Sequence, residues 1–521
     1  MIFKAGLTQQ ANVQPAFDPG MPRQVKFPPM AQSTPPSHLD VCTGEAGDMR
    51  RRLPGDLVPG VFLSGFAGRM AIFLCLALAV VGQVDGAGAQ TLEDALNSAY
   101  LNNPTLLGQR AKVRATDEQV PQALSNWRPS VEITGSAGLS AVQSTTSTDR
   151  GQHREPKSIG VTVTQPLYRG GRTIAATREA ENTVQAERSR LVETEQDILL
   201  LAATAFLDVY RDQAVLKLNI KNEQVLKRQL EATRDRFQVG EITRTDVHQA
   251  EARLAGATAD RTEAEGSLEA SRASYQNVVG MPAPRKLVPA VLPGGLPKSQ
   301  DMAVLRAVKN NPVVISAEFD RKALDDNVDE VRGELLPSVS VSTGLSRKLQ
   351  SAGETGRIDS AELTLNLTVP LYQQGEVYSR LREAKHEVAE QIHAIDQARR
   401  NAAEDAARAW KSLLTAQARV KAFKAQNEAN VVALEGVERE AQVGSRTVLD
   451  VLDAEQELLD SRVSHVTAER DELIAVFELK VAIGQLTASE MKLAVDAYKP
   501  AGHYRNVRGK WFGGGIPERA Q

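Results

Sequence analysis

Two hydrophobic patterns alternate along this chain. Near residues 131–134, 161–164, 339–342 and 363–368, an apolar residue occupies every second position. This spacing predicts β-strands with one apolar and one polar face. Other segments have apolar residues at the helical spacing. We therefore predict a mainly α-helical chain that carries four amphipathic strands.

Two of the helical segments are unusually long. Residues 172–238 contain no proline and no glycine, and a second long helical pattern runs from 376 to 442. At 1.5 Å per residue, each predicts a helix about 100 Å long. Such helices need partners along their whole length. Returning helices end near Val279 and near Ile483, so the sequence predicts two long helical hairpins.

The two hairpins have matching turns. Gln238-Val239-Gly240 and Gln442-Val443-Gly444 break the helical pattern at a glycine, which predicts a tight turn. The glycines are 204 residues apart, and Pro166-Leu167-Tyr168 and Pro370-Leu371-Tyr372 are separated by the same interval. We therefore predict an internal two-fold repeat.

This repeat divides the chain into five predicted parts. They are an upstream extension with a signal peptide (1–89), a first repeat (90–286), a linker (287–298), a second repeat (299–486) and a polar C-terminal tail (487–521). Each repeat is predicted to hold a helix, two strands and a long helical hairpin.

The first part has the features of a secretory signal. Met49-Arg50-Arg51-Arg52 precedes an apolar core, and the small-x-small site Ala87-Gly88-Ala89 stands before Gln90. We expect the mature chain to begin at or near Gln90. Cys42 and Cys75 precede this position, so we expect no disulfide and no cysteine metal site.

Composition excludes several classes of function. The net charge is −3, so no nucleic-acid partner is indicated. We find no nucleophile motif, nucleotide loop or dinucleotide fingerprint in a supporting context, so we expect no enzyme activity and no cofactor. His386, Glu390 and His393 share a helix face, which we interpret as a solvated face and not as a metal site.

The apolar faces of the four strands need an apolar environment. Aromatic and branched residues are too sparse for a β-sandwich core, whereas a lipid-facing barrel with a polar lumen fits the alternation. Four strands cannot close a barrel, and open edges are not tolerated in lipid. The barrel must therefore be shared among chains, and the helices that continue the strands should form a shared tube.

The ordered motifs resemble those of TolC-type outer-membrane efflux and secretion channels. The resemblance covers residues 90–486, with Asn-Asn-Pro at 102–104 and 310–312, the Pro-Leu-Tyr pair, and the most specific stretch, 443–453. It implies a homotrimer, with a twelve-stranded barrel above a twelve-helix periplasmic tunnel in a Gram-negative envelope. Such a channel is the passive exit duct of a tripartite efflux pump or a type I secretion system, for drugs, other small molecules or proteins.

The resemblance also implies partners. These are a periplasmic adaptor protein, an inner-membrane pump of the ABC, RND or MFS type, and outer-membrane lipid. The hairpin tips, which contact the adaptor in the family, correspond to Val239, Gly240, Val443 and Gly444.

Two aspartates follow the second turn. Asp450 and Asp453 are three residues apart and so share a helix face. Threefold symmetry would place six carboxylates around one opening, as in cation-selective pores. The resemblance implies that they are the family's entrance aspartates.

Tyr168 and Tyr372 are either interfacial aromatic anchors or ordinary packing residues.

A gate is also implied by the resemblance. The residues that match its members are Arg446, Asp246 and Thr245, and their contact holds the entrance shut in the family. The family's tyrosine three residues before the turn glycine is replaced by Ala441, so we expect a thinner network.

Two other functions remain open at this point. A periplasmic adaptor also has long hairpins, but it should have one hairpin and a lipoyl-like β domain. A coiled-coil spacer without a pore is the second alternative.

Overall fold

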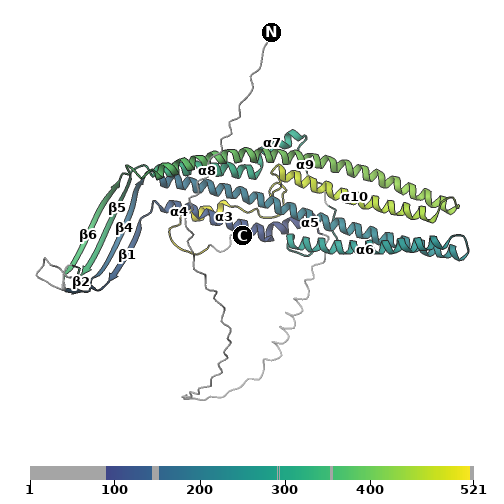
Figure 1. Cartoon of the computed structure of the whole chain (residues 1–521), viewed down its shortest axis with the longest axis horizontal. Helices are drawn as coiled ribbons and strands as arrows, with labels where there is room; N and C mark the ends of the chain where they lie inside the picture. The colour runs from purple at the N-terminus through teal and green to yellow at the C-terminus, as the bar shows by residue number, and fades with distance from the viewer. Residues whose placement is uncertain (1–89, 143–151, 290–291, 293, 352–355, 517–521) are drawn as a thin grey trace, which may run out of the picture. The chain divides into compact units, whose positions relative to one another are not determined.

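The computed structural model describes residues 90–142, 152–289, 292, 294–351 and 356–516 (Figure 1), and all of them belong to one compact unit. The predicted signal peptide and both cysteines lie outside these residues. The helices are α2 (Leu92–Asn102), α3 (Pro104–Asp117), α4 (Gln119–Ser125), α5 (Arg172–Gln238), α6 (Arg244–Val279), α7 (Gln300–Asn310), α8 (Pro312–Gly333), α9 (Glu376–Gln442), α10 (Val448–Ala482) and α11 (Ala501–Val507).

Cap chemistry explains most of the helix boundaries. α5 and α9 have 67 residues each and start after glycines in the left-handed region, Gly171 and Gly375. The helical stretch at residues 91–126 is divided into α2, α3 and α4, and the first break arises because Asn103 caps α3 and Pro104 has no N–H to continue α2. Thr91 and Asp94 form the capping box that their spacing suggests.

Four strands form one antiparallel sheet. β1 (Ser130–Ala137), β4 (Lys157–Arg169), β5 (Ser338–Leu349) and β6 (Arg357–Thr368) lie in the order β1-β4-β5-β6. The predicted strands are therefore confirmed, and β1 and β6 are the edges. A short hairpin of β2 (Ser140–Val142) and β3 (Gln152–Arg154) lies between β1 and β4, outside the four predicted strands.

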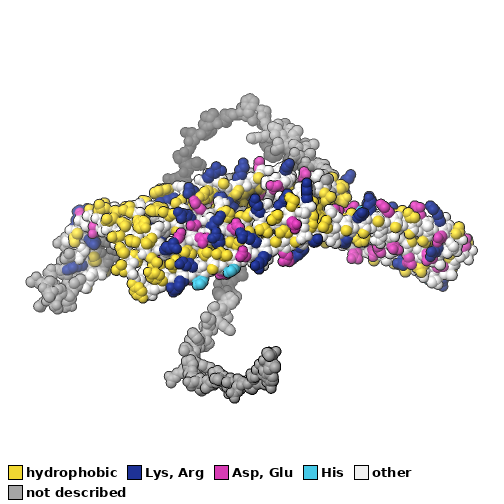
Figure 2. All heavy atoms as spheres, turned by 90° about the horizontal axis from the view of Figure 1, so that it is seen from above, with side chains coloured by type: hydrophobic (Ala, Val, Ile, Leu, Met, Phe, Trp, Pro, Cys, Tyr) yellow, Lys and Arg dark blue, Asp and Glu magenta, His cyan; other side chains and the backbone are white. Residues whose placement is uncertain are grey.

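The register gives the sheet two different faces. Ile133 pairs with Val161, which pairs with Leu345, so an apolar row crosses the strands. The next row on the other face contains Glu132, Thr162, Gly344 and Glu362. The apolar residues are largely exposed within one chain, and Figure 2 shows hydrophobic side chains gathered toward the strand end of the unit.

β4 is longer than its sequence suggests. A proline such as Pro166 cannot donate a ladder hydrogen bond and often marks the end of a strand, but pairing continues to Arg169 through a register shift between Pro166 and Tyr168. The shift absorbs one residue and places Tyr168 opposite Val339, in the row that continues to Leu367. Tyr372, by contrast, lies beyond the end of β6.

Two glycines join the sheet to the helices. Gly170, just after β4, has a φ of 65°, and a Cβ there would lie 2.2 Å from the carbonyl oxygen of Gly333. A Cβ on Gly333 would in turn meet Arg172 and the Gly170 carbonyl. The two backbones therefore pack directly on each other where α8 ends and α5 begins.

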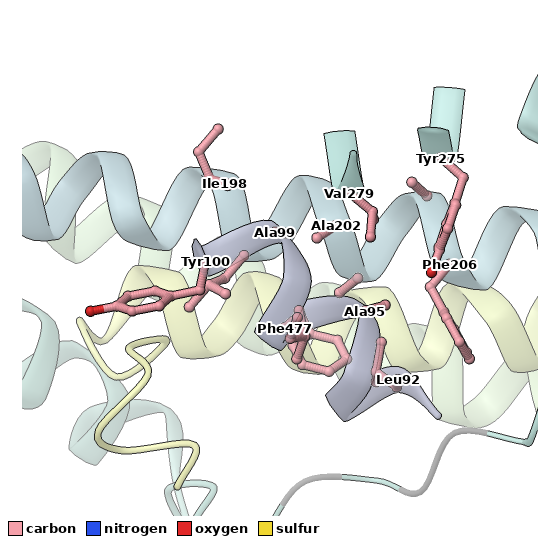
Figure 3. Close-up of a cluster of buried hydrophobic side chains, with 14 of the residues drawn as sticks. Leu92, Ala95, Ala99, Tyr100, Ile198, Ala202, Phe206, Tyr275, Val279 and Phe477 are labelled. Atoms are coloured by element: carbon pink, nitrogen blue, oxygen red, sulfur yellow. The ribbon is translucent and has the colours of Figure 1, made fainter. Parts of the chain in front are cut away.

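The long helices lie side by side (Figure 1). α5 contacts α6 along one side, and α8 and α10 lie between α5 and α9. α2, α3 and α4 also pack on α5. The main core forms where α2, α5, α6 and α10 meet, and it contains Phe206, Tyr275 and Phe477 (Figure 3). Within the residues given above, no helix is long and apolar enough to cross a membrane.

Candidate functional site

The two hairpin turns have the same backbone design. Gly240 and Gly444 adopt φ values of 83° and 80°, and Val239 and Val443 beside them are strongly exposed. Thr243 and Thr447 then cap the returning helices α6 and α10. The predicted tip residues are thus presented at the end of each hairpin, where a partner can reach them.

Asp450 has a structural role at its turn. Its carboxylate accepts hydrogen bonds from the backbone N–H and the hydroxyl of Thr447, at 2.9 and 2.8 Å. These bonds, helped by the nearby Arg446 guanidinium, lower the pKa of the Asp450 carboxyl. Asp246 makes the same capping box with Thr243 in the first turn. Asp450 therefore stays charged and also fixes the start of α10.

Arg446 is bound within its own turn. Its Nε donates to Glu440 Oε2 at 2.9 Å, and its Nη1 lies 4.0 Å from Asp450 Oδ1. Among the ion pairs of the described residues, none joins Arg446 to Asp246, and Thr245 is exposed. The gate contact is not formed within one chain, so it stays a prediction about the assembled tips.

Asp453 has a partner that the sequence reasoning missed. Arg253 on α6 donates to its Oδ1, so an ion pair joins the returning helices of the two hairpins. Both side chains are partly exposed, at 40% and 55%. The two residues are 200 positions apart, close to the 204 positions between the turn glycines, and this is the signal that could have placed these opposite charges at similar distances from the tips.

An apolar cluster lies next to this pair. It joins α5, α6 and α10 near the tips, and its buried members are Leu226, Leu230, Ala250, Ala257, Val448 and Leu452. Val448 and Leu452 precede Asp453 on α10, while Ala250 and Ala257 flank Arg253 on α6. The tips of the two hairpins are therefore held together by packing and by one ion pair.

The two junction tyrosines and the histidine-containing face of α9 are exposed. Tyr168 and Tyr372 are 44% and 79% exposed near the junction of strands and helices. His386, Glu390 and His393 lie on the exposed side of α9. Over the described ranges, no group of three or more His, Cys, Asp or Glu residues is arranged to hold a metal ion.

The sequence matches the outer membrane efflux protein family over residues 95–281 and 304–485. This chain belongs to that family. The family is one of transport channels and not of enzymes.

Named members of this family align with most of this chain. The outer membrane efflux protein BepC of Brucella suis is 35% identical over 82% of this chain and 93% of its own length. The outer membrane protein TolC of Vibrio cholerae is 27% identical over 77% of this chain and 92% of its own length. The solved structure of VceC from Vibrio cholerae has the same fold, with a TM-score of 0.65 at 18% identity, over 75% of this chain and 96% of that one.

Proposed function

We propose that three copies of this chain form an exit duct in the outer membrane, with a twelve-stranded barrel continued by a twelve-helix periplasmic tunnel. The duct serves efflux or type I secretion, and its relatives are named for efflux and for the secretion of proteases. This assembly is supported mainly by one observation: the four-stranded sheet has two open edges.

The sheet cannot stand alone in lipid. Its outer strands β1 and β6 each pair on one side only, and its apolar face is exposed. Backbone N–H and C=O groups at an open edge would be unpaired in the bilayer, at several kcal/mol each. Pairing β6 of one copy with β1 of the next removes every edge. The resemblance to TolC-type channels supports three as the number of copies.

The helices have edges in the same order. Along the tip half of the hairpins the sequence of neighbours is α6, α5, α10 and α9. α6 and α9 are the outer helices, just as β1 and β6 are the outer strands. One rotation between copies would therefore close both layers, which supports a tube that continues the barrel.

The polar face of the sheet would line the lumen. It carries Glu132 and Glu362, together with hydroxyl pairs such as Ser136–Ser158 and Ser346–Ser360. Such a surface suits a water-filled passage. Transport through it is passive, and the energy comes from an inner-membrane pump, of ABC, RND or MFS type, linked by a periplasmic adaptor that contacts the tips at Val239, Gly240, Val443 and Gly444.

The entrance lies at those tips. We propose that Asp450 and Asp453 of three copies surround it, that Arg446 of one tip bonds Asp246 and Thr245 of another, and that these contacts hold it closed. The two-fold repeat, its linker, the removal of residues 1–89 and the anchoring role of Tyr168 and Tyr372 belong to the same proposal.

Opposite faces of β5 provide the test. Leu345→Arg puts a charge on the apolar row, and Ser342→Arg puts the same charge on the polar face. An arginine facing lipid near the midplane costs about 2–4 kcal/mol per chain. We expect Leu345→Arg to abolish heat-modifiable trimers in the outer-membrane fraction, and Ser342→Arg to keep them and change conductance. Equal trimer yields for both variants would refute a lipid-facing barrel.

A further inference from the structure

Residues 487–516, which follow α10, fold onto the rest of the unit. Tyr504 on α11 donates to Glu181 Oε1 at 3.0 Å, and Arg508 donates to the same oxygen at 3.0 Å. His503 lies 3.1 Å from the fully buried Asp117, and Val507 is 1% exposed. α11 is therefore fixed against α3 and α5, as the yellow segment beside α3 in Figure 1 shows.

The docking of α11 brings the residues after it in the chain to the base of the sheet. Arg128 lies two residues before β1, and its Nη1 donates to the carbonyl of Lys510 at 2.8 Å. The Arg128 guanidinium carbon also lies 4.8 Å from the centre of the Trp511 ring. Trp511 and the adjacent Phe512, with ring centres 6.5 Å apart, are thus held where the polypeptide enters its first strand.

Both rings point away from the protein core. Trp511 is 58% exposed and Phe512 is 87% exposed, and Ile516 after them is 88% exposed. Exposed aromatic rings at a fixed position are costly in water, because their apolar surface stays hydrated. Their surroundings should therefore be something other than bulk water.

Other residues at this level have similar character. Trp127 precedes Arg128, and Gln165 of β4 donates to its carbonyl at 2.9 Å. Trp127 and Tyr168 are 37% and 44% exposed. Trp and Tyr gather at membrane–water interfaces, where an apolar ring meets a wet headgroup. The tail pair thus extends a set of aromatic residues at the foot of the strands.

The charge of the tail favours a lipid surface. Residues 501–516 contain three basic residues and no acidic residue. Arg508 is paired with Glu181, which leaves Arg505 and Lys510 to face a lipid surface. Basic residues beside aromatic rings are typical of segments that lie in the headgroup region and attract anionic lipids.

We propose that residues 505–512, the tail anchor, bind the headgroup region of the periplasmic leaflet, with Trp511 and Phe512 inserted to the level of the upper acyl chains. This rests on the proposed function, since it requires the strands to span the bilayer. The tail then fixes the height of the barrel at a point outside the barrel itself.

Tryptophan quenching tests the proposal. The double variant Trp127→Phe/Trp410→Phe leaves Trp511 as the single indole, and Trp127→Phe/Trp511→Phe leaves Trp410 of α9 as the matched control. Each full-length protein is placed in nanodiscs of phospholipid with or without bromine on the upper acyl chain. We expect roughly twofold lower emission from Trp511 in brominated lipid, because an interfacial indole lies within reach of those carbons, and little change from Trp410.

The same samples separate this proposal from the proposed function. Inserted, conducting trimers in which Trp511 is not quenched would overturn the tail anchor alone, whether its emission is that of a water-exposed or of a protein-covered indole. Absence of trimers from nanodiscs of the unmodified protein would overturn the proposed function instead. Phe512→Cys carrying a polarity-sensitive dye is a second probe, and a dye that reports water in conducting trimers would also refute the anchor.

Discussion

The two helical hairpins share one backbone plan but differ in what they bury. α5 and α9 have 67 residues each, and their returning helices have 36 and 35. α5 buries large side chains such as Leu199, Phe206 and Val209, whereas most residues that α9 buries are alanines.

Position within the helical layer explains the difference. α5 lies between α6 and α10 and is also covered by α2, α3 and α8, whereas α9 is an outer helix of the layer. The local sequence thus sets the length and the turn of each hairpin. Its neighbours set which side chains become core, so α9, which has fewer neighbours within the chain than α5, buries mostly small side chains.

The largest expected effect comes from matched aromatic residues. Phe206 is fully buried in α5, and Trp410, 204 residues later in α9, is only partly buried. We expect Phe206→Ala to lower the free energy of unfolding by about 3–5 kcal/mol, and Trp410→Ala to lower it less. Urea titration followed by circular dichroism measures both. A larger loss for Trp410→Ala would mean that α9 is the more deeply buried helix in the assembled protein.

The next prediction concerns the Arg253–Asp453 ion pair, which joins the two hairpins near their tips. Arg253→Ala should cost only about 0.2–1 kcal/mol, because both partners are exposed. It should nevertheless raise single-channel conductance and increase cation preference, because the Asp453 carboxylate loses its counter-charge. The control is Arg261→Ala on the same helix, whose partners Glu223 and Glu265 belong to the first hairpin. Identical channels for the two variants would show that the Arg253 pair has no part in the entrance.

The smallest effect concerns acid pH. The pKa of Asp450 is lowered, so this carboxylate keeps its charge at a pH where an ordinary aspartate begins to be protonated. Its stabilisation of the start of α10 is present above the ordinary pKa and is lost as pH falls through the lowered value. We therefore expect cation preference, measured as reversal potential, to change little between pH 7 and about 4.5. Asp450→Asn keeps the cap and should weaken the preference throughout this range. Asp246→Asn at the first turn should weaken it less, and equal effects would remove the distinction between the two tips.

Much of the fold followed from spacing along the chain. The absence of helix breakers predicted α5, the glycine turns predicted where both long helices end, and period-two alternation predicted β1, β4, β5 and β6. These features are local, so a single sequence contains them. The continuation of β4 past Pro166 was not predicted, because a strand can absorb a proline when its register shifts beside it.

The site was less predictable, because it depends on residues far apart in the sequence. The turn sequence indicated Asp450 but not its cap with Thr447, and the Asp453–Arg253 pair depends on how two hairpins pack. Likewise, the tail has no periodicity that would reveal its place. Only its contacts with Glu181, Asp117 and Arg128 locate Trp511 beside the strands.

The contact between Gly170 and Gly333 has a mechanical consequence. α5 begins two residues after Gly170 and runs about 100 Å to its turn, so a tilt of about one degree at its base would move the tip by roughly 1.7 Å. Backbones that touch without side chains between them leave little room for such a tilt. Gly170→Ala would wedge this joint open, and the lever would deliver the error to the opposite end of the molecule.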